Sequence, residues 1–114
     1  MYQVYDVAQL LGAGENVIGV ILGDGWAVGY IAFHHRQQYF DRPRLLAQLE
    51  ITLTDGHAIT VATDRSWKHR FGPLLENDLI MGEAYDARLE MPGWDAPGFD
   101  NARWMRLYVR TGNF

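Results

Sequence analysis

The sequence predicts an all-β protein, an antiparallel sandwich or barrel with one or two short helical turns. Two observations lead to this fold class. Many short segments of strand-like composition alternate with turns rich in Gly, Pro, Asn and Asp along the 114 residues. Almost no stretch keeps the 3.6-residue period of an amphipathic helix. The length and the 48% hydrophobic content predict one globular domain over residues 1–114.

In the N-terminal part of the chain, the sequence predicts two strands that are separated by a helical turn and a glycine-rich turn. Tyr2–Tyr5 has strand composition, and Asp6 is placed to cap a short helical turn that ends at Leu11. A glycine-rich turn follows over Gly12–Asn16. The nearly unbroken aliphatic run Val17–Leu22 has the length of a strand, and we expect it to be the most buried segment of the chain.

The middle of the chain predicts a loop followed by a central strand. After the turn at Gly23-Asp-Gly25, an extended apolar pattern runs over Trp26–Phe33. His34–Arg44 is polar and follows neither structural period, which predicts a loop of a length that is often functional. Apolar and polar residues alternate over Arg44–Leu53, as in a strand with one buried face.

The second half predicts hairpins and loops. Asp55-Gly56 is a hairpin signal, because Asp-Gly accepts the positive φ angles of tight turns. Further strands are expected over residues 57–63, 67–71, 74–81, 83–89 and 105–110. Met91–Gly98, with two prolines and two glycines around Trp94, predicts a packed loop, and Asp100 is placed to cap a single turn.

Charge and composition exclude several classes of function. The net charge of −4 and the scattered basic residues argue against a nucleic-acid-binding surface. The chain has no cysteine, which excludes disulfides and thiolate metal sites and fits either a reducing or an oxidising compartment. No stretch has the pattern of a leader segment or the length of a membrane span, so we expect no membrane partner.

Several polar residues have both a chemical and an ordinary interpretation. Adjacent His34 and His35 point to opposite faces of an extended segment, which favours solvated loop histidines over metal ligands. A glycosidase requires two facing carboxylates, and four acidic residues are candidates for one end of a sandwich: Asp24, Asp41, Glu83 and Asp86.

Four tryptophans suggest stacking on sugar rings. Trp67 and Trp104 each follow a turn that begins with Asp, where a buried ring would anchor the turn to the core. Trp26 and Trp94 lie in or beside glycine-rich loops and are the better ligand candidates, although packing remains the alternative for both.

Asp41-Arg-Pro43 is the candidate for binding chemistry in the polar loop. A carboxylate held by a proline at the start of a central strand suits a pair of hydroxyls or a hard cation such as Ca²⁺. The alternative is an exposed Asp–Arg pair of little energetic weight.

Four ordered motifs resemble a known family, the N-terminal β-sandwich domain of bacterial α-L-rhamnosidases. The motifs are Leu22-Gly-Asp-Gly-Trp26, Arg42-Pro-Arg-Leu-Leu-Ala-Gln-Leu-Glu-Ile51, Gly82-Glu-Ala-Tyr-Asp-Ala-Arg88 and Pro92-Gly-Trp-Asp-Ala-Pro-Gly-Phe-Asp100. The preceding segment Tyr5–Asn16 resembles a turn of galactose-binding-like jelly-roll domains. The resemblance covers nearly the whole chain.

The resemblance implies a galactose-binding-like jelly-roll β-sandwich without catalytic residues of its own. In the full enzymes, a separate helical barrel hydrolyses terminal α-L-rhamnosyl bonds. Some related domains bind L-rhamnose through a calcium ion held by an Asp-Asn pair. Asp41 matches the first residue of that pair, but Arg42 replaces the amide, and a guanidinium repels a cation. Ala27 also replaces a frequent tyrosine.

These considerations predict an accessory domain or fragment of an α-L-rhamnosidase. It either recognises rhamnose-containing glycans or supports the catalytic domain. The expected ligand-binding residues are Asp41, Arg42, Trp26, Asp24, Glu83 and Tyr85, with Asp41 as a potential Ca²⁺ ligand. Two alternatives stay open, a small glycoside hydrolase that uses Asp41 with Glu83 and a structural domain without ligand. Relatives have further strands before Tyr2, so an unpaired sheet edge and self-association are also expected.

Overall fold

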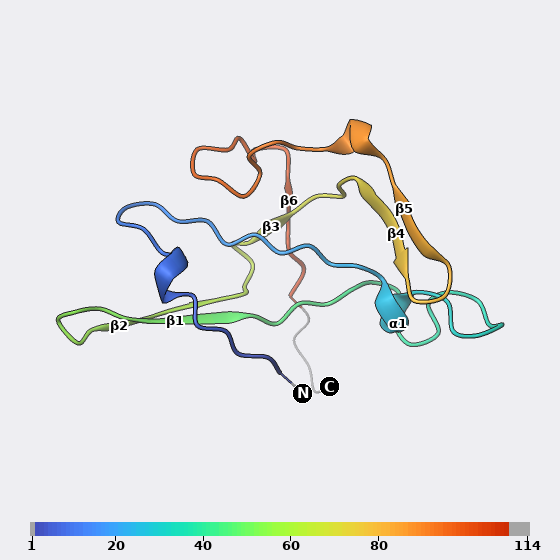
Figure 1. The fold of residues 1–114 in the computed structure, drawn as a ribbon, viewed down its shortest axis with the longest axis horizontal. Helices are drawn as coiled ribbons and strands as arrows, with labels where there is room; N and C mark the ends of the chain where they lie inside the picture. The colour runs from blue at the N-terminus through green and yellow to red at the C-terminus, as the bar shows by residue number, and fades with distance from the viewer. Residues whose placement is uncertain (1, 110–114) are drawn as a thin grey trace.

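The protein consists of short strands joined by long irregular segments. The structure is a computed structural model that describes residues 2–109. Its elements are, in order, the 3₁₀ turn η1 (Ala8–Leu10), the helix α1 (Gly25–Val28), β1 (Gln48–Thr52), β2 (Ala58–Ala62), β3 (Lys68–His69), β4 (Leu74–Asp78), β5 (Gly82–Tyr85), the 3₁₀ turn η2 (Ala87–Leu89) and β6 (Met105–Arg106). The strands pair as β1–β2, β3–β6 and β4–β5, each antiparallel (Figure 1). The predicted all-β, antiparallel class is confirmed.

The β1–β2 hairpin follows the predicted pattern. Along β1, exposed and half-buried residues alternate, as expected for a strand whose two faces differ in polarity. The turn residue Gly56 has a φ of 86°, which glycine adopts without strain, and the Asp55 carboxylate accepts a hydrogen bond of 2.9 Å from the backbone N–H of His57. The strand predicted over Arg44–Leu53 is therefore confirmed in its second half, and the hairpin signal at Asp55-Gly56 is confirmed.

The β4–β5 hairpin lies beside α1 at the other end of the molecule (Figure 1). A register irregularity occurs between Leu74 and Glu76. The strand predicted over residues 83–89 ends at Tyr85, because Asp86 accepts a hydrogen bond of 3.0 Å from the backbone N–H of Arg88 and starts the 3₁₀ turn η2.

Short polar side chains close three of the predicted turns, although one differs in detail. The Asp6 carboxylate accepts a hydrogen bond of 3.0 Å from the N–H of Ala8, but the N-cap of η1 is Val7 and the turn ends at Leu10. The Asn16 side chain closes the glycine-rich turn by bonding both the N–H and the C=O of Gly12, at 2.9 Å each. Asp100 accepts a bond of 2.9 Å from the N–H of Ala102. Each is a short polar side chain that satisfies the backbone of its own turn.

Three predicted strands do not form. Tyr2–Tyr5 and Val17–Leu22 are irregular, because no described segment lies beside them as a hydrogen-bonded partner. The expectation that Val17–Leu22 is the most buried segment is also wrong, since Ile21 is 71% exposed. Trp26–Phe33 is not extended throughout: α1 occupies its beginning, and a bridge between Ile31 and His34 closes a tight turn after it. The last predicted strand is observed only as β6, and its final residue, Arg110, lies outside the described residues.

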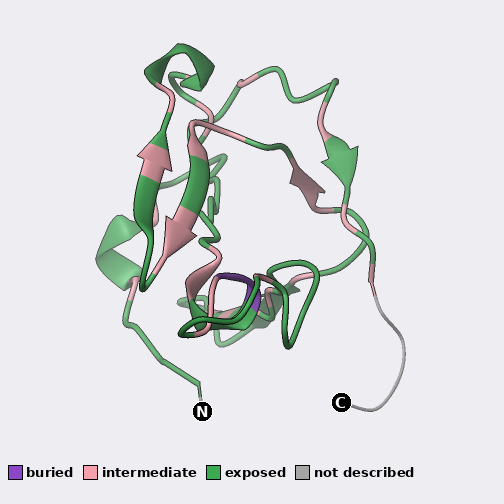
Figure 2. Ribbon diagram, turned by 90° about the vertical axis from the view of Figure 1, so that its right-hand side faces the viewer, coloured by how far each residue is buried: buried purple, intermediate pink, exposed green. Residues whose placement is uncertain are grey.

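The apolar side chains are largely uncovered. Among the described residues, Val28 is the sole buried hydrophobic residue, with 3% of its surface exposed (Figure 2). The radius of gyration is 16.7 Å, against about 13 Å for a compact domain of similar length. The hairpins therefore have apolar faces that the described chain does not cover. No helix within residues 2–109 has the length and apolar character to cross a membrane.

Candidate functional site

Arg36, which lies in the polar loop after α1, forms hydrogen bonds with Asp24 and with the β4–β5 hairpin. Its Nη2 donates to Asp24 Oδ2 at 2.7 Å, and its Nη1 donates to Glu76 Oε1 on β4 at 3.1 Å. The backbone N–H of Asn77 also donates to Asp24, at 3.4 Å. The guanidinium carbon lies 5.9 Å from the centre of the Tyr30 ring. We call Arg36, Asp24, Glu76 and Asn77 the Arg36 cluster.

Like that of Asp24, the carboxylate of Asp78 stabilises the backbone around it. It accepts hydrogen bonds from the backbone N–H groups of Met81 at 2.8 Å and Ile80 at 2.7 Å, and it also accepts one from Tyr30 N–H. The pKa of Asp78 lies below its ordinary value, chiefly because the Met81 N–H stabilises the carboxylate and in part because the Arg36 charge is near. Asp78 thus fixes both the β4–β5 turn and the segment after α1.

Two of the six predicted ligand-binding residues meet at this cluster. Asp24 belongs to it directly, and Glu83 Oε2 accepts a hydrogen bond of 3.3 Å from Asn77 Nδ2. Trp26, which is 47% exposed, lies in α1 two residues after Asp24. Tyr85 lies on β5, and its hydroxyl donates to Glu90 at 2.8 Å. That hydrogen bond raises the pKa of Tyr85 above its ordinary value.

The remaining two predicted residues form an exposed pair. Arg42 Nε lies 3.7 Å from Asp41 Oδ2, and the side chains of Arg42 and Asp41 are 81% and 74% exposed. Such a pair in water contributes about 0–1 kcal/mol. No hydrogen bond or ion pair within residues 2–109 links it to the Arg36 cluster. The structure therefore does not bring the six predicted residues together in one site.

The calcium ion predicted at Asp41 would need further oxygen ligands. Calcium takes six to eight oxygen ligands, whereas Asp41 has the Arg42 guanidinium as its ionic partner. Across the described part of the chain, no group of three or more His, Asp or Glu side chains is arranged to hold a metal. Calcium binding stays a prediction that a titration tests.

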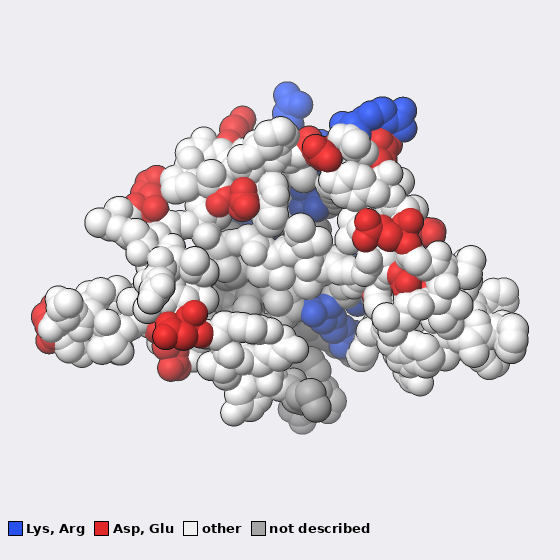
Figure 3. Space-filling view, viewed as in Figure 1, with Lys and Arg blue, Asp and Glu red and all other residues white. Residues whose placement is uncertain are grey.

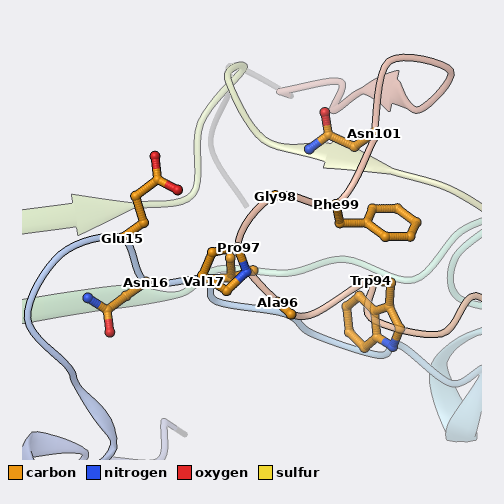
Figure 4. A pocket seen from close by; sticks show the side chains of 9 residues that line it. All are labelled: Glu15, Asn16, Val17, Trp94, Ala96, Pro97, Gly98, Phe99 and Asn101. Atoms are coloured by element: carbon orange, nitrogen blue, oxygen red, sulfur yellow. The ribbon is translucent and has the colours of Figure 1, made fainter.

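Sequence reasoning did not single out a small pocket at the loop around Trp94. Its volume is about 300 Å³, at the lower end of ligand sites (Figure 4). Its lining residues are Glu15, Asn16, Val17, Trp94, Ala96, Pro97, Gly98, Phe99 and Asn101. Among these residues, the sequence indicates Trp94 alone as a ligand candidate. The other members are residues 96–99 and 101 of the same loop and Glu15, Asn16 and Val17 from the glycine-rich turn near the N-terminus, and no local motif connects that turn to the loop.

Aromatic packing holds two residues that line this pocket, Trp94 and Phe99. Trp94 stacks on Trp104 with ring centres 6.4 Å apart, and Phe99 meets Trp104 edge-on at 5.8 Å. Asn101 Oδ1 accepts a hydrogen bond of 2.7 Å from Lys68, which leaves the amide N–H groups of its side chain for other acceptors. Trp104 therefore packs as predicted, and the Trp94 ring both packs and lines a hollow.

A larger apolar groove lies along the β1–β2 hairpin. Its volume is about 600 Å³. Its lining residues are Leu11, Gly12, Gly14, Asn16, Val17, Ile18, Leu49, Ile51, Leu53, Ile59, Val61 and Trp67. We call this feature the β1–β2 groove. The alternation in β1 indicated one buried face, but the sequence did not show that the face would be left open.

The face shown in Figure 3 has no large patch of a single charge. Its acidic side chains are spread over the surface among fewer basic ones. The ten Lys and Arg residues are outnumbered by fourteen Asp and Glu residues. That the chain does not bind nucleic acid stays a prediction.

Comparison with known proteins points to one family. The family model described as "Alpha-L-rhamnosidase N-terminal domain" matches residues 1–113. An α-L-rhamnosidase from Streptomyces avermitilis is 39% identical over 106 residues, which are 93% of this chain and 10% of that protein. One from Formosa agariphila is 38% identical over 104 residues, covering 88% of this chain and 11% of that protein. The chain thus spans about a tenth of the length of these relatives.

Two solved structures share the fold. The crystal structure of Streptomyces avermitilis α-L-rhamnosidase complexed with L-rhamnose matches with a TM-score of 0.68 and 41% identity, over 72% of this chain and 8% of that one. The structure of α-L-rhamnosidase from Dictyoglumus thermophilum matches with a TM-score of 0.58 and 36% identity, over 60% of this chain and 8% of that one. Both matches support the β-sandwich class.

Proposed function

Because the chain belongs to the family of α-L-rhamnosidase N-terminal domains, we propose that it is a non-catalytic accessory domain that supports the catalytic domain of a larger enzyme. That enzyme hydrolyses terminal α-L-rhamnosyl bonds. The proposal goes beyond family membership in two respects, the lack of catalysis by this chain and the supporting role.

The lack of catalysis is supported by the protein partners of the candidate catalytic carboxylates. A glycosidase needs two carboxyl groups that face each other across a sugar, at about 5–9.5 Å. Here Asp24 binds Arg36, Glu83 binds Asn77, Asp41 pairs with Arg42, and Asp86 pairs with Arg88. Each acidic candidate thus has its own partner from the protein. This arrangement favours a structural use of the acidic residues over the alternative of a small hydrolase.

The isolated chain tests the lack of catalysis. We expect it to release no p-nitrophenol from p-nitrophenyl α-L-rhamnoside above the rate in buffer. Release that disappears in both Asp41→Asn and Glu83→Gln would establish the small-hydrolase alternative. A full-length α-L-rhamnosidase in the same assay is the positive control.

Recognition of rhamnose-containing glycans is a second candidate function, and the pocket at Trp94 favours it. The C–H face of a sugar packs on aromatic rings, and its hydroxyls need a few polar partners. Trp94 and Phe99 supply aromatic surface, and Glu15 and Asn101 supply a carboxylate and an amide (Figure 4). A neutral sugar also agrees with the net charge of −4.

Calorimetry with L-rhamnose separates the modes of binding. Heat of binding that Glu15→Gln weakens, with or without Ca²⁺, supports the pocket. Heat that requires Ca²⁺ and disappears in Asp41→Asn supports the binding mode that the family resemblance implies. No heat under either condition contradicts recognition and leaves the supporting role alone.

A further inference from the structure

The β1–β2 hairpin has one polar and one apolar face. In its register, Leu49 lies opposite Val61 and Ile51 lies opposite Ile59, so these four side chains share one face. Their sequence neighbours point to the other face. All four apolar residues line the β1–β2 groove, and the intervening residues Glu50 and Thr60 do not.

The apolar face lacks a cover within the described chain. Ile59 and Val61 are 44% and 37% exposed, and Ile18 across the groove is 43% exposed. A two-stranded hairpin is at best marginally stable in water unless its apolar face packs against another layer. Contiguous exposed apolar surface of this kind marks a site of association.

We propose that the β1–β2 groove is the docking surface for an apolar segment from the remaining polypeptide of an α-L-rhamnosidase, packed as a second layer over the hairpin. The inference rests on the proposed supporting role and specifies where that contact lies.

The length of the relatives argues for this occupant. In each curated relative, the matching region is about a tenth of one continuous chain. A segment of the same polypeptide meets the groove at an effective concentration of about millimolar, which a second copy of the protein does not reach in dilute solution. The groove lining also selects an apolar partner, because Asn16 is its one amide side chain and that amide is bonded within its own turn.

Photocrosslinking in a full-length enzyme identifies the occupant. The chain replaces the matching region of the Streptomyces avermitilis enzyme, and benzoylphenylalanine is introduced at Ile59 or, as the matched control on the opposite face, at Thr60. We expect irradiation to link position 59, and not position 60, to a peptide of the host polypeptide outside the graft. A link from 59 to a second copy, or equal labelling from both positions, overturns the proposal.

A pair of substitutions provides an independent readout in the same enzyme. Val61→Gln places an amide in the groove, and Thr60→Gln places the same side chain on the polar face. We expect Val61→Gln to lower the melting temperature by at least about 2 °C relative to Thr60→Gln. Equal melting temperatures contradict the groove assignment. If the unsubstituted graft itself does not restore a stable enzyme, the supporting role fails, which is a different result.

Discussion

Arg36 Nη2 lies 2.7 Å from Asp24 Oδ2, and this contact connects the loop after α1 to the residue that precedes the helix. The same guanidinium also reaches Glu76 on β4. One side chain thus holds together three segments that are distant in sequence. The polar loop is the part of the chain for which the sequence predicts a function, and one of its arginines, Arg36, has a structural role.

The first prediction concerns Arg36. Replacing it with Ala leaves the half-buried carboxylate of Asp24 without its charged partner, so we expect the free energy of unfolding to fall by about 1–2 kcal/mol. Urea denaturation followed by tryptophan fluorescence measures the change. Arg88→Ala is the matched control, because Arg88 is 89% exposed and pairs with Asp86 alone. Equal losses in the two variants would show that the Arg36 cluster has no special weight.

The second prediction concerns Gly29, where the backbone passes very close to its neighbours. A Cβ there would overlap the Asp78 carboxylate and the backbone carbonyl of Gly25, and a backbone carbonyl shifts only if the chain itself moves. We expect Gly29→Ala to destabilise the chain by more than about 1 kcal/mol. Gly12→Ala is the control, since a Cβ at Gly12 meets no atom within 4 Å. The same urea titration compares the two, and an unchanged midpoint for Gly29→Ala would contradict the close contact.

The third prediction concerns acid. Hydrogen bonds hold the pKa of Asp78 below its ordinary value of 3.8 in the folded state, so near that pH the unfolded chain binds the proton more readily. The contribution of Asp78 to stability is therefore complete above about pH 4 and is lost as the pH falls through the folded-state pKa. Urea midpoints between pH 6 and pH 3 should decline less steeply in Asp78→Asn than in the unsubstituted chain. Parallel curves would mean that Asp78 does not contribute.

The fourth prediction is that the isolated chain self-associates. The hairpins present unpaired edges, and the β1–β2 groove exposes apolar side chains. Light scattering after size-exclusion chromatography should show a mass above 13.0 kDa that rises with concentration. Val61→Gln should shift the distribution toward monomer, whereas Thr60→Gln should not. A stable, monodisperse monomer would contradict both the open edges and the open groove.

The sequence predicted local structure well where one residue determines it. The Asp55-Gly56 hairpin, the Asp6 and Asp100 turns and the alternation in β1 all follow from chemistry within a few residues. The strand expected over Val17–Leu22 is wrong, because a strand needs a hydrogen-bonded partner and composition does not supply one.

The candidate site was harder to predict than the local structure. Asp24 and Glu83 meet through Asn77, and the pocket at Trp94 joins turns that are about 80 residues apart; long-range contacts of this kind leave no local pattern. The position of Asp41 before a central strand predicts a binding role, but its side chain lies in solvent beside Arg42. The resemblance of four sequence motifs to α-L-rhamnosidase N-terminal domains predicts the family, and the match of the family model over residues 1–113 confirms it.

The supporting role is tested most directly by the thermal inactivation of Streptomyces avermitilis α-L-rhamnosidase. Three forms are compared: the intact enzyme, the enzyme without the region that matches this chain, and the enzyme with this chain grafted in that place. We predict that deletion shortens the half-life at elevated temperature at least tenfold and that the graft restores most of it. A deleted enzyme as long-lived as the intact one, or a graft no better than the deletion, would contradict the account.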